Sequence, residues 1–260
     1  MGKYVNYEIR YDHTAVLTLN RPEAMNALSE ELLYELNTHI DNIKATDSIR
    51  CTIITGSGEK AFCAGADLKE RKGMSEQQTI AAVSAIGEVA RKIEMMGMPV
   101  IAALNGSALG GGLELALACD IRIAADHAKL GLTETSLAII PGAGGTQRMT
   151  RLIGAGQTKR LIFTAARMTA AEALQLGLVE QTASSAQLLD EAMEMAGAVA
   201  ANGPVAVKQA KTAINQGSQT DLGTALSIEH LCYKETITTD DRLEGLQAFR
   251  DKRKPVYQGF

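Results

Sequence analysis

The stretch Gly106-Ser107-Ala108-Leu109-Gly110-Gly111-Gly112-Leu113-Glu114 decides how this chain is interpreted. Three consecutive glycines in an apolar run cost backbone entropy, and that cost is tolerated where a backbone must come very close to another group. Glu114 follows among leucines and alanines, where a buried carboxylate is expensive unless it is paired or useful. Glu134 supplies a second carboxylate further along the chain. A glycine-rich helix start beside two carboxylates predicts an acid/base site whose backbone N–H groups stabilise an oxyanion.

Each of these features also has a purely structural explanation. A triple glycine more often serves tight packing of a helix on a strand, and a lone glutamate in a helix or loop mostly faces solvent. The pair of glutamates therefore carries the functional interpretation. These segments do not match the familiar motifs that would indicate another function. The glycines lack the GxGxxG spacing, residues 141–146 lack the Gly-Lys-Ser/Thr of a P-loop, and Ser107 is not in a GxSxG turn.

Composition excludes several classes of protein. The chain has 260 residues, a net charge of −4 and a pI of about 5.7, which is the wrong sign for general binding to nucleic-acid phosphates. Aromatic residues make up only 4% of the sequence, so stacking platforms for single-stranded nucleic acid are hard to build. The four histidines share no ligand spacing. We therefore expect neither a nucleic-acid partner nor a metal.

Cysteine usage and hydropathy predict a cytoplasmic protein. Cys51, Cys63, Cys119 and Cys232 are scattered without a CxxC pair, so a disulfide framework and structural zinc are not expected, and free thiols fit a reducing compartment. The sequence opens with no secretory signal pattern. Its apolar stretches are too short to span a bilayer, so no membrane attachment is expected.

The hydrophobic pattern predicts strand–helix units followed by a helical block. A β-hairpin is expected over 4–20, with Asp12 and His13 between its strands, and a helix after Ser29, which is a good N-terminal signal before two glutamates. Further strands are predicted over 51–55, 100–104 and 120–124, and further helices over 75–96, from the glycine run to about 119, and over 146–152, 156–164, 170–176, 187–201, 204–216, 221–236 and 240–252.

This organisation indicates an α/β core with an added helical region. We interpret residues 1–200 as the catalytic core and residues 201–260 as a helical C-terminal oligomerisation region. A late helical block with apolar faces often packs on a partner subunit. The alternative is that it covers its own core.

A second glycine-bearing turn runs from Cys63 to Lys69 after a hydrophobic approach. Ala66 in this turn is a candidate for a second backbone N–H donor. Asp67 is the residue type of a helix N-cap or turn rather than of a catalyst.

Together these segments resemble the crotonase superfamily, and in particular the enoyl-CoA hydratases. The matching segments cover essentially the whole chain: 20–22, 61–69, 105–114, Cys119-Asp120, Glu134, 140–148 and 249–253. The resemblance implies a spiral of repeated ββα units with a helical C-terminal trimerisation region. It also implies a homotrimer, usually assembled as a dimer of trimers.

The resemblance assigns roles to the residues of the opening stretch. It implies that the N–H groups of Ala66 and Gly111 form an oxyanion hole for the thioester carbonyl. Glu114 and Glu134 match the family's catalytic acids, and we assign Glu114 to activating water for attack at C3 and Glu134 to protonating C2. The implied reaction is the reversible syn-addition of water to a trans-2-enoyl-CoA, giving a 3-hydroxyacyl-CoA in fatty-acid or short-chain acyl-CoA metabolism. No separate cofactor is implied, because coenzyme A is part of the substrate.

The resemblance also suggests contacts to coenzyme A. Arg21 and Lys69 are candidate phosphate contacts. Phe249 and Lys252 are expected near the nucleotide, often from a neighbouring subunit. The predicted coenzyme A contacts are Ala24, Met25, Ala64, Asp67, Leu68, Lys69, Phe249 and Lys252.

Within the family the chain looks most like the methylglutaconyl-CoA hydratase branch, which includes RNA-binding members. Segments 68–71, 114–122, 213–217 and 241–246 carry this likeness. Methylglutaconyl-CoA hydration in leucine degradation is therefore the main alternative, and its carboxylated acyl tail needs a nearby cation. RNA binding is disfavoured because the helix after Ser29 is acidic and has no lysine before Lys44. A non-catalytic assembly subunit is disfavoured by the intact glycine run and glutamates. Acyl-chain preference, pathway, partner enzymes and the choice of trimer or hexamer stay open.

Overall fold

A computed structural model describes residues 2–11 and 13–260 of the chain. The predicted N-terminal hairpin is confirmed: β1 (Val5–Arg10) pairs antiparallel with β2 (Thr14–Leu19), with Val5 opposite Leu19. Asp12, which we placed between these strands, lies outside the described residues.

A six-stranded sheet forms the centre of the fold. Its order is β1-β2-β3-β5-β7-β10, with β3 (Cys51–Gly56), β5 (Val100–Leu104), β7 (Ile121–Ala125) and β10 (Gln181–Ala183). From β2 to β10 all neighbours are parallel. Strands β3 and β5 are buried at every residue, as expected for parallel strands that are covered on both faces.

A second, four-stranded sheet runs in the order β4-β6-β8-β9. Its strands are β4 (Ala61–Cys63), β6 (Ser107–Leu109), β8 (Lys129–Gly131) and β9 (Met168–Thr169). Each turn of the chain gives one strand to each sheet, as in β3–β4, β5–β6 and β7–β8. The repeated ββα pattern therefore exists in the structure. The sequence patterns did not predict these second strands, because two or three residues show no periodicity.

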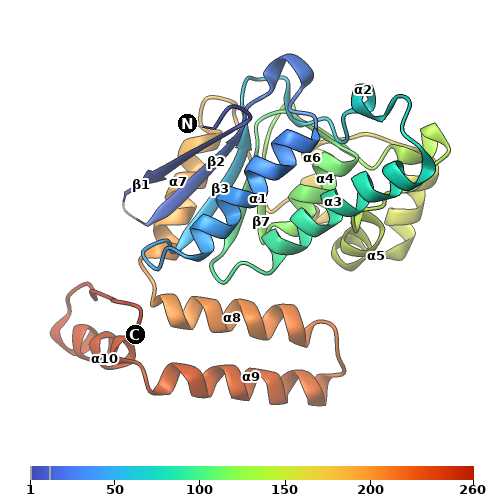
Figure 1. Ribbon diagram of the computed structural model, residues 1–260. Helices are drawn as coiled ribbons and strands as arrows, with labels where there is room; N and C mark the ends of the chain where they lie inside the picture. The colour runs from blue at the N-terminus through green and yellow to red at the C-terminus, as the bar shows by residue number, and fades with distance from the viewer. Residues whose placement is uncertain (1, 12) are drawn as a thin grey trace.

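Helices cover both faces of the larger sheet (Figure 1). α1 (Glu30–Lys44), capped by Ser29 as predicted, packs on β1 and β2, while α7 (Leu188–Ala200) packs on β2, β3, β5 and β7. α3 (Glu76–Glu94) lies between α1 and α4 (Gly111–Ala118). Every residue of α4 is buried. The helix that begins in the triple glycine is thus at the centre of the core.

The rest of the core agrees with the predicted helices. α5 (Gly145–Phe163) is interrupted by the non-helical backbone of Gly154 (φ +76°), so the two helices predicted over 146–152 and 156–164 are confirmed as its two halves. It is followed by α6 (Ala170–Leu176). Short helical turns that the sequence did not predict are η1 (Pro22–Ala24), α2 (Leu68–Arg71) and η2 (Glu134–Leu137).

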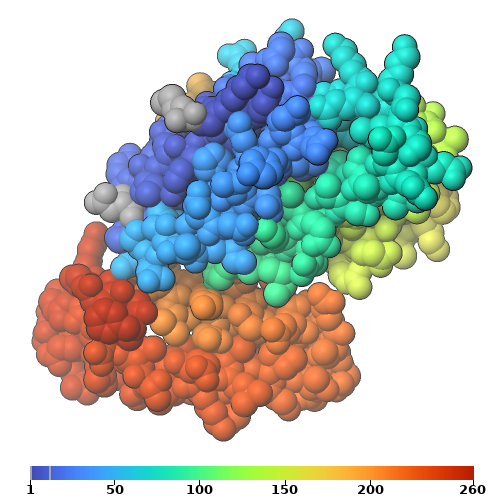
Figure 2. Space-filling view, viewed as in Figure 1, coloured from blue at the N-terminus to red at the C-terminus, as the bar shows by residue number. Residues whose placement is uncertain are grey.

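The C-terminal helices form a separate layer. α8 (Pro204–Gly217) and α9 (Leu222–Ile237) run side by side, and α10 (Asp240–Asp251) follows them at the foot of the molecule (Figure 1). Figure 2 shows this layer beneath the core. Lys211 of α8 anchors it by bonding Asp120 Oδ2 at 2.7 Å and the carbonyl of Met98 at 3.1 Å. Packing of this layer on a partner subunit stays a prediction.

Candidate active site

The three glycines at the start of α4 each have a separate role. Gly110 has φ +50°, and a Cβ there would lie 3.1 Å from Glu134 Oε1. This position needs glycine both for its backbone conformation and for the approach of the carboxylate. A Cβ on Gly112 would collide with the backbone carbonyl of Cys63, so Gly112 packs α4 against β4. Gly111 has ordinary space around it, with Leu28 at 3.4 Å and Ile86 at 3.6 Å from an ideal Cβ.

Two backbone N–H groups come together at this helix start. A Cβ on Gly111 would lie 3.7 Å from the Ala66 nitrogen, and a Cβ on the preceding Gly65 (φ +97°) would lie 3.3 Å from the Gly111 nitrogen. Within the described part of the chain, neither the Ala66 nor the Gly111 N–H donates a hydrogen bond. Two neighbouring free donors at the positive end of a buried helix form a suitable site for an oxyanion.

Glu114 is a buried carboxylate with backbone donors. Its side chain lies one turn into α4 and the residue is 3% exposed. The Ala143 and Gly145 N–H groups both donate to Oε1 at 2.8 Å. Burial raises the pKa of Glu114, while these two bonds and the charge of Arg148 oppose the rise. The bonds stabilise the ionised form, which suits a base.

Glu134 has a different environment. It opens η2, and its Oε2 is buried with no hydrogen-bond partner among the described residues. Burial raises the pKa of Glu134 to about 7, and the charge of Glu114 adds to the rise. A carboxyl group with this pKa carries a proton in about half of the molecules at neutral pH, which suits an acid.

A cleft of about 680 Å³ opens beside the two free N–H groups. Leu28 and Ile86, which border Gly111, line it together with residues of α1, α2 and α3. Arg71 of α2 also lines the cleft and is half-buried. Its charge lowers the pKa of both Glu114 and Glu134, against the larger effect of burial. Arg71 therefore lines the cleft and also acts electrostatically on both carboxylates, which do not themselves line it.

Comparison with known proteins agrees with this geometry. Residues 10–259 match the family described as "Enoyl-CoA hydratase/isomerase". The chain belongs to this family.

Individual relatives are similar over most of their length. YngF of Bacillus subtilis strain 168, whose name places it among the enoyl-CoA hydratase/isomerases, is 56% identical over 259 residues and 100% of both chains. The mitochondrial methylglutaconyl-CoA hydratase of Homo sapiens is 49% identical, with 94% of this chain and 73% of that protein covered. A crystal structure of an enoyl-CoA hydratase from Bacillus anthracis has a TM-score of 0.98 and 52% identity, covering 99% of this chain and 100% of that chain.

These matches confirm the crotonase fold, the family and the enzyme class expected from the sequence. Short-chain-enoyl-CoA and crotonyl-CoA hydratases are also 45% identical to the chain. The roles of single residues and the oligomeric state are not part of what the matches establish.

The loops predicted to bind coenzyme A gather on one side of the site. Met25 and Ala64 are neighbours, since the Ala64 N–H donates to the Met25 carbonyl at 3.0 Å, and Ala24 ends η1 beside them. Leu68 is 60% exposed and Lys69 is exposed. These residues can therefore contact the same ligand.

Two of the charged residues in these loops bond to one another. Asp67 caps α2 by accepting the Lys69 N–H at 3.0 Å, as the sequence predicted, and pairs with Arg21 at 2.9 Å. Arg21 also donates to the Ala27 carbonyl at 2.8 Å. The Arg21 guanidinium thus tethers the two loops to each other, and its contact with a phosphate stays a prediction.

Phe249 and Lys252 are not brought to the site of the same chain. Phe249, 85% exposed, lies on α10 and Lys252 caps the end of that helix. Figure 1 places α10 at the opposite end of the molecule from α2. Their predicted contact with coenzyme A therefore requires another subunit.

Other kinds of site are not visible in the described residues. In residues 2–11 and 13–260, no cluster of histidine, cysteine and acidic side chains could hold a metal ion. Within the same residues, no helix has the length and apolar character needed to cross a bilayer.

The sequence analysis overlooked two arginines. Arg71 appeared only as part of a family motif, and Arg148 only as the end of another. Nothing local in the sequence indicates that Arg71 lines the cleft or that Arg148 reaches the loop that holds Glu114.

Proposed function

We propose that this protein hydrates short-chain trans-2-enoyl-CoA thioesters, giving 3-hydroxyacyl-CoA. The observation that carries the proposal is the meeting of the buried Glu114, the half-buried Glu134 and two unengaged N–H groups at the glycine-rich start of α4. Enoyl-CoA hydration needs a base, an acid and a place for negative charge, and these groups supply all three.

The thioester oxygen binds between the N–H groups of Ala66 and Gly111. Negative charge builds on this oxygen when water adds to the double bond and an enolate forms. Donors that are fixed in advance stabilise that charge by about 3–4 kcal/mol each. The partial positive charge at the start of α4 acts in the same direction.

The two glutamates hold one water molecule between them and divide the proton transfers. Glu114 accepts a proton from the water as its oxygen bonds to C3, and the π electrons of the double bond move to the thioester oxygen. Glu134 then gives its proton to C2 as the enolate collapses. Glu114 has gained one proton and Glu134 has lost one, so exchange between them or with solvent restores the starting state. The two carboxyl groups titrate as a coupled pair.

Coenzyme A enters as part of the substrate, and we propose no separate cofactor. Ala24, Met25, Ala64 and Leu68 supply backbone and apolar contacts, and Lys69 is the candidate for a phosphate. Asp67 acts by shaping the loop, since its carboxylate is already bonded. Phe249 and Lys252 reach the nucleotide from a neighbouring subunit.

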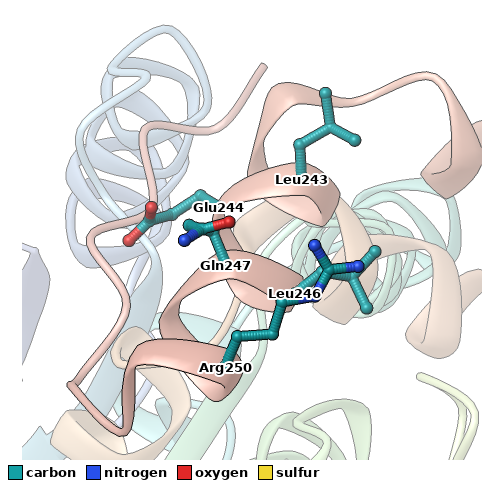
Figure 3. A pocket seen from close by; sticks show the side chains of 5 residues that line it. All are labelled: Leu243, Glu244, Leu246, Gln247 and Arg250. Carbon is teal, nitrogen blue, oxygen red and sulfur yellow. The ribbon is translucent and has the colours of Figure 1, made fainter.

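We propose a homotrimer, assembled as a dimer of trimers, as the working form. The C-terminal layer exposes many apolar side chains that would otherwise face water. Leu243 and Leu246 border a hollow of about 440 Å³ on α10 with Glu244, Gln247 and Arg250 (Figure 3). The exposed apolar residues of the layer are Ile214, Leu222, Leu226, Leu231, Tyr233, Leu243, Leu246, Phe249, Val256 and Phe260. A cytoplasmic location fits the four free, buried cysteines.

The proposal is tested by following loss of the conjugated enoyl-thioester absorbance with crotonyl-CoA. We expect turnover by the wild type and a loss of at least about 100-fold in kcat for Glu114→Gln and for Glu134→Gln, with acyl-CoA binding retained. Near-normal turnover by either variant would refute the role given to that residue. No turnover by the wild type with any enoyl-CoA would refute the hydratase function.

Arg71 supports a second candidate, the hydration of an enoyl-CoA with a carboxylated tail. Its half-buried guanidinium has no hydrogen-bond or ion-pair partner among the described residues. The other cation of the cleft, Lys92, is paired with Asp41 at 2.9 Å. A half-buried cation without a partner is free to pair with a carboxylate on the acyl chain. 3-Methylglutaconyl-CoA is such a substrate.

Replacing Arg71 distinguishes the two candidates. If the tail is carboxylated, Arg71→Met lowers kcat/KM for 3-methylglutaconyl-CoA by about 10- to 100-fold and changes that for crotonyl-CoA by less than about 3-fold. Each variant is assayed at its own pH optimum, because Arg71 also acts on the glutamates. Lys92→Met is the matched control and leaves both substrates unchanged. Equal losses for the two substrates would remove the carboxylated tail from consideration.

A further inference from the structure

The loop of residues 141–145, here called the cradle loop, holds the carboxylate of Glu114. Both of its N–H donors, from Ala143 and Gly145, bond to Oε1. Oε2 makes no hydrogen bond within the described residues. The position of Oε2, the oxygen left for water, thus depends on how firmly the cradle loop is fixed.

Arg148 holds this loop through a hydrogen bond to its backbone. It lies one turn into α5 and donates from Nη1 to the carbonyl of Ala143 at 2.9 Å. That carbonyl lies along the backbone between the two N–H groups that bond Glu114. The Arg148 guanidinium occupies the space that a Cβ at position 144 would fill. Because residue 144 is glycine, the loop leaves room for Arg148 there.

Glu94 in turn fixes Arg148. Nε and Nη2 of the guanidinium donate to the two oxygens of Glu94 at 3.1 and 2.9 Å. This is a bidentate pair, which sets orientation as well as distance. The Arg148 side chain is 16% exposed and that of Glu94 is 38% exposed. Glu94 is the last residue of α3, and α3 also packs on the loop through Gly87, which lies beside Ala143.

We propose that Arg148, oriented by Glu94, is a positioning residue that holds the cradle loop so that Glu114 presents its Oε2 to water as a carboxylate. This inference rests on the proposed function of Glu114 as the base. Arg148 bonds Glu94 and the backbone of the cradle loop, so it acts through Glu114. Its positive charge also lowers the pKa of Glu114, against the larger effect of burial.

A purely structural role, in which Arg148 only joins α3 to α5, makes different predictions. It would lower the melting temperature without changing how Glu114 titrates. The two roles separate in the pH dependence of the reaction, because loss of a positive charge near a carboxylate raises the pKa of that carboxylate.

The test compares Arg148→Met, Arg148→Lys and Glu94→Gln by steady-state kinetics with crotonyl-CoA. Arg148→Met should lower kcat by about 10- to 100-fold with KM within about 3-fold, since a small misplacement of a reacting group has effects of this size. Its acidic limb of kcat/KM should move to higher pH. Arg148→Lys keeps the positive charge but loses the bidentate geometry of the guanidinium. We therefore expect kcat to fall while the acidic limb of the kcat/KM profile stays at its wild-type pH.

Glu94→Gln covers the case in which the arginine variants do not fold. It removes the charge that orients Arg148 and should lower kcat by about 3- to 10-fold. Arg151→Gln is the matched control, because Arg151 lies one turn further along α5 and bonds only Gln147. The control should keep wild-type kinetics.

A readout that needs no turnover separates this inference from the proposed function. In ¹³C-glutamate-labelled protein, the Glu114 carboxyl signal is assigned by its loss in Glu114→Gln and titrated by NMR. Its titration should move to higher pH in Arg148→Met, even if the enzyme proves not to be a hydratase. An unchanged titration, or wild-type kcat and pH profile in all three variants, would overturn the inference.

Discussion

Glu114 and Glu134 are the same residue type, and burial raises the pKa of both, but their hydrogen-bond surroundings differ. Glu114 accepts two backbone N–H groups, which favour the carboxylate. Glu134 has a buried oxygen without a partner, and burial raises its pKa to about 7. Environments that separate the pKa values of two carboxyl groups assign the acid and the base. The sequence supplies two glutamates, and the local hydrogen bonds make them unequal.

The raised pKa of Glu134 predicts a pH-dependent effect on stability. The folded protein binds this proton more tightly than the unfolded chain, so stability is lost as pH rises from about 4.5 to about 7, and the cost is fully present above that range. Glu134→Gln removes the cost. We expect it to stabilise the fold by roughly 1–2 kcal/mol above pH 7, a few degrees in Tm, with little effect near pH 4.

Thermal melts of the wild type and Glu134→Gln across this pH range test the prediction. Glu59→Gln, at an exposed position, is the control. A difference in Tm between Glu134→Gln and the wild type that is the same at every pH would contradict it. The same variant loses activity, as expected where a strained group serves catalysis.

At the level of elements, α4 carries both the packing and the chemistry. Its eight residues are buried, and its first turn supplies a glycine that touches β4, a free N–H and the base. Each further polar side chain in α4 would need its own buried hydrogen-bond partners, as Glu114 has in the Ala143 and Gly145 N–H groups. The long apolar run with one glutamate is therefore explained by the position of the helix.

Two alanine substitutions in α4 should have opposite consequences. Gly111→Ala places its Cβ in ordinary contact with Leu28 and Ile86, so the fold should survive, but this Cβ lies 3.7 Å from the Ala66 nitrogen and obstructs the thioester oxygen. We expect kcat/KM to fall by about 100-fold with Tm nearly unchanged.

Gly112→Ala forces a Cβ into the Cys63 carbonyl, so we expect a loss of at least about 2 kcal/mol in stability. Circular-dichroism melts and crotonyl-CoA kinetics on both variants compare the two positions. A Gly111→Ala enzyme with wild-type kinetics would contradict the proposed oxyanion site.

At the scale of the whole molecule, a few polar contacts attach the C-terminal layer to the core. Besides the Lys211–Asp120 pair, Arg50 of the core donates to the carbonyl of Tyr257 at 2.7 Å. The layer also exposes large apolar side chains. The proposed assembly with other copies of the chain would cover this apolar surface.

Charged substitutions on α10 should dissociate the assembly. Leu243 and Leu246 are 58% and 47% exposed, so the double variant Leu243→Asp/Leu246→Asp should fold as a monomer. Burying two charges in an interface costs several kcal/mol. Light scattering coupled to gel filtration would show the change in mass.

Ile9→Thr, on β1 outside this layer, is the control and should keep the wild-type mass. Because Phe249 and Lys252 lie on the same C-terminal layer, the monomer should also bind acyl-CoA more weakly. An unchanged mass for the double variant would exclude this face from the interface.

The sequence by itself determined the long elements and the two glutamates. The helix after Ser29, the strand over 100–104 and the helix from the glycine run are each specified by local signals of capping, burial and periodicity. The family resemblance rests on the same residues. These features are local, so they can be predicted without knowing the packing.

Only the tertiary structure decided which groups meet. The short strands of the second sheet have no periodicity, yet they bring Ala66 to Gly111 and Gly110 to Glu134. Packing also paired Arg21 with Asp67, placed Arg71 in the cleft and brought Arg148 to Ala143. Some of these contacts join residues that are distant in sequence. Others determine which charged side chain has a bonding partner and which has none. Local sequence patterns do not predict these contacts, because the contacts depend on the free energy of the whole packed chain.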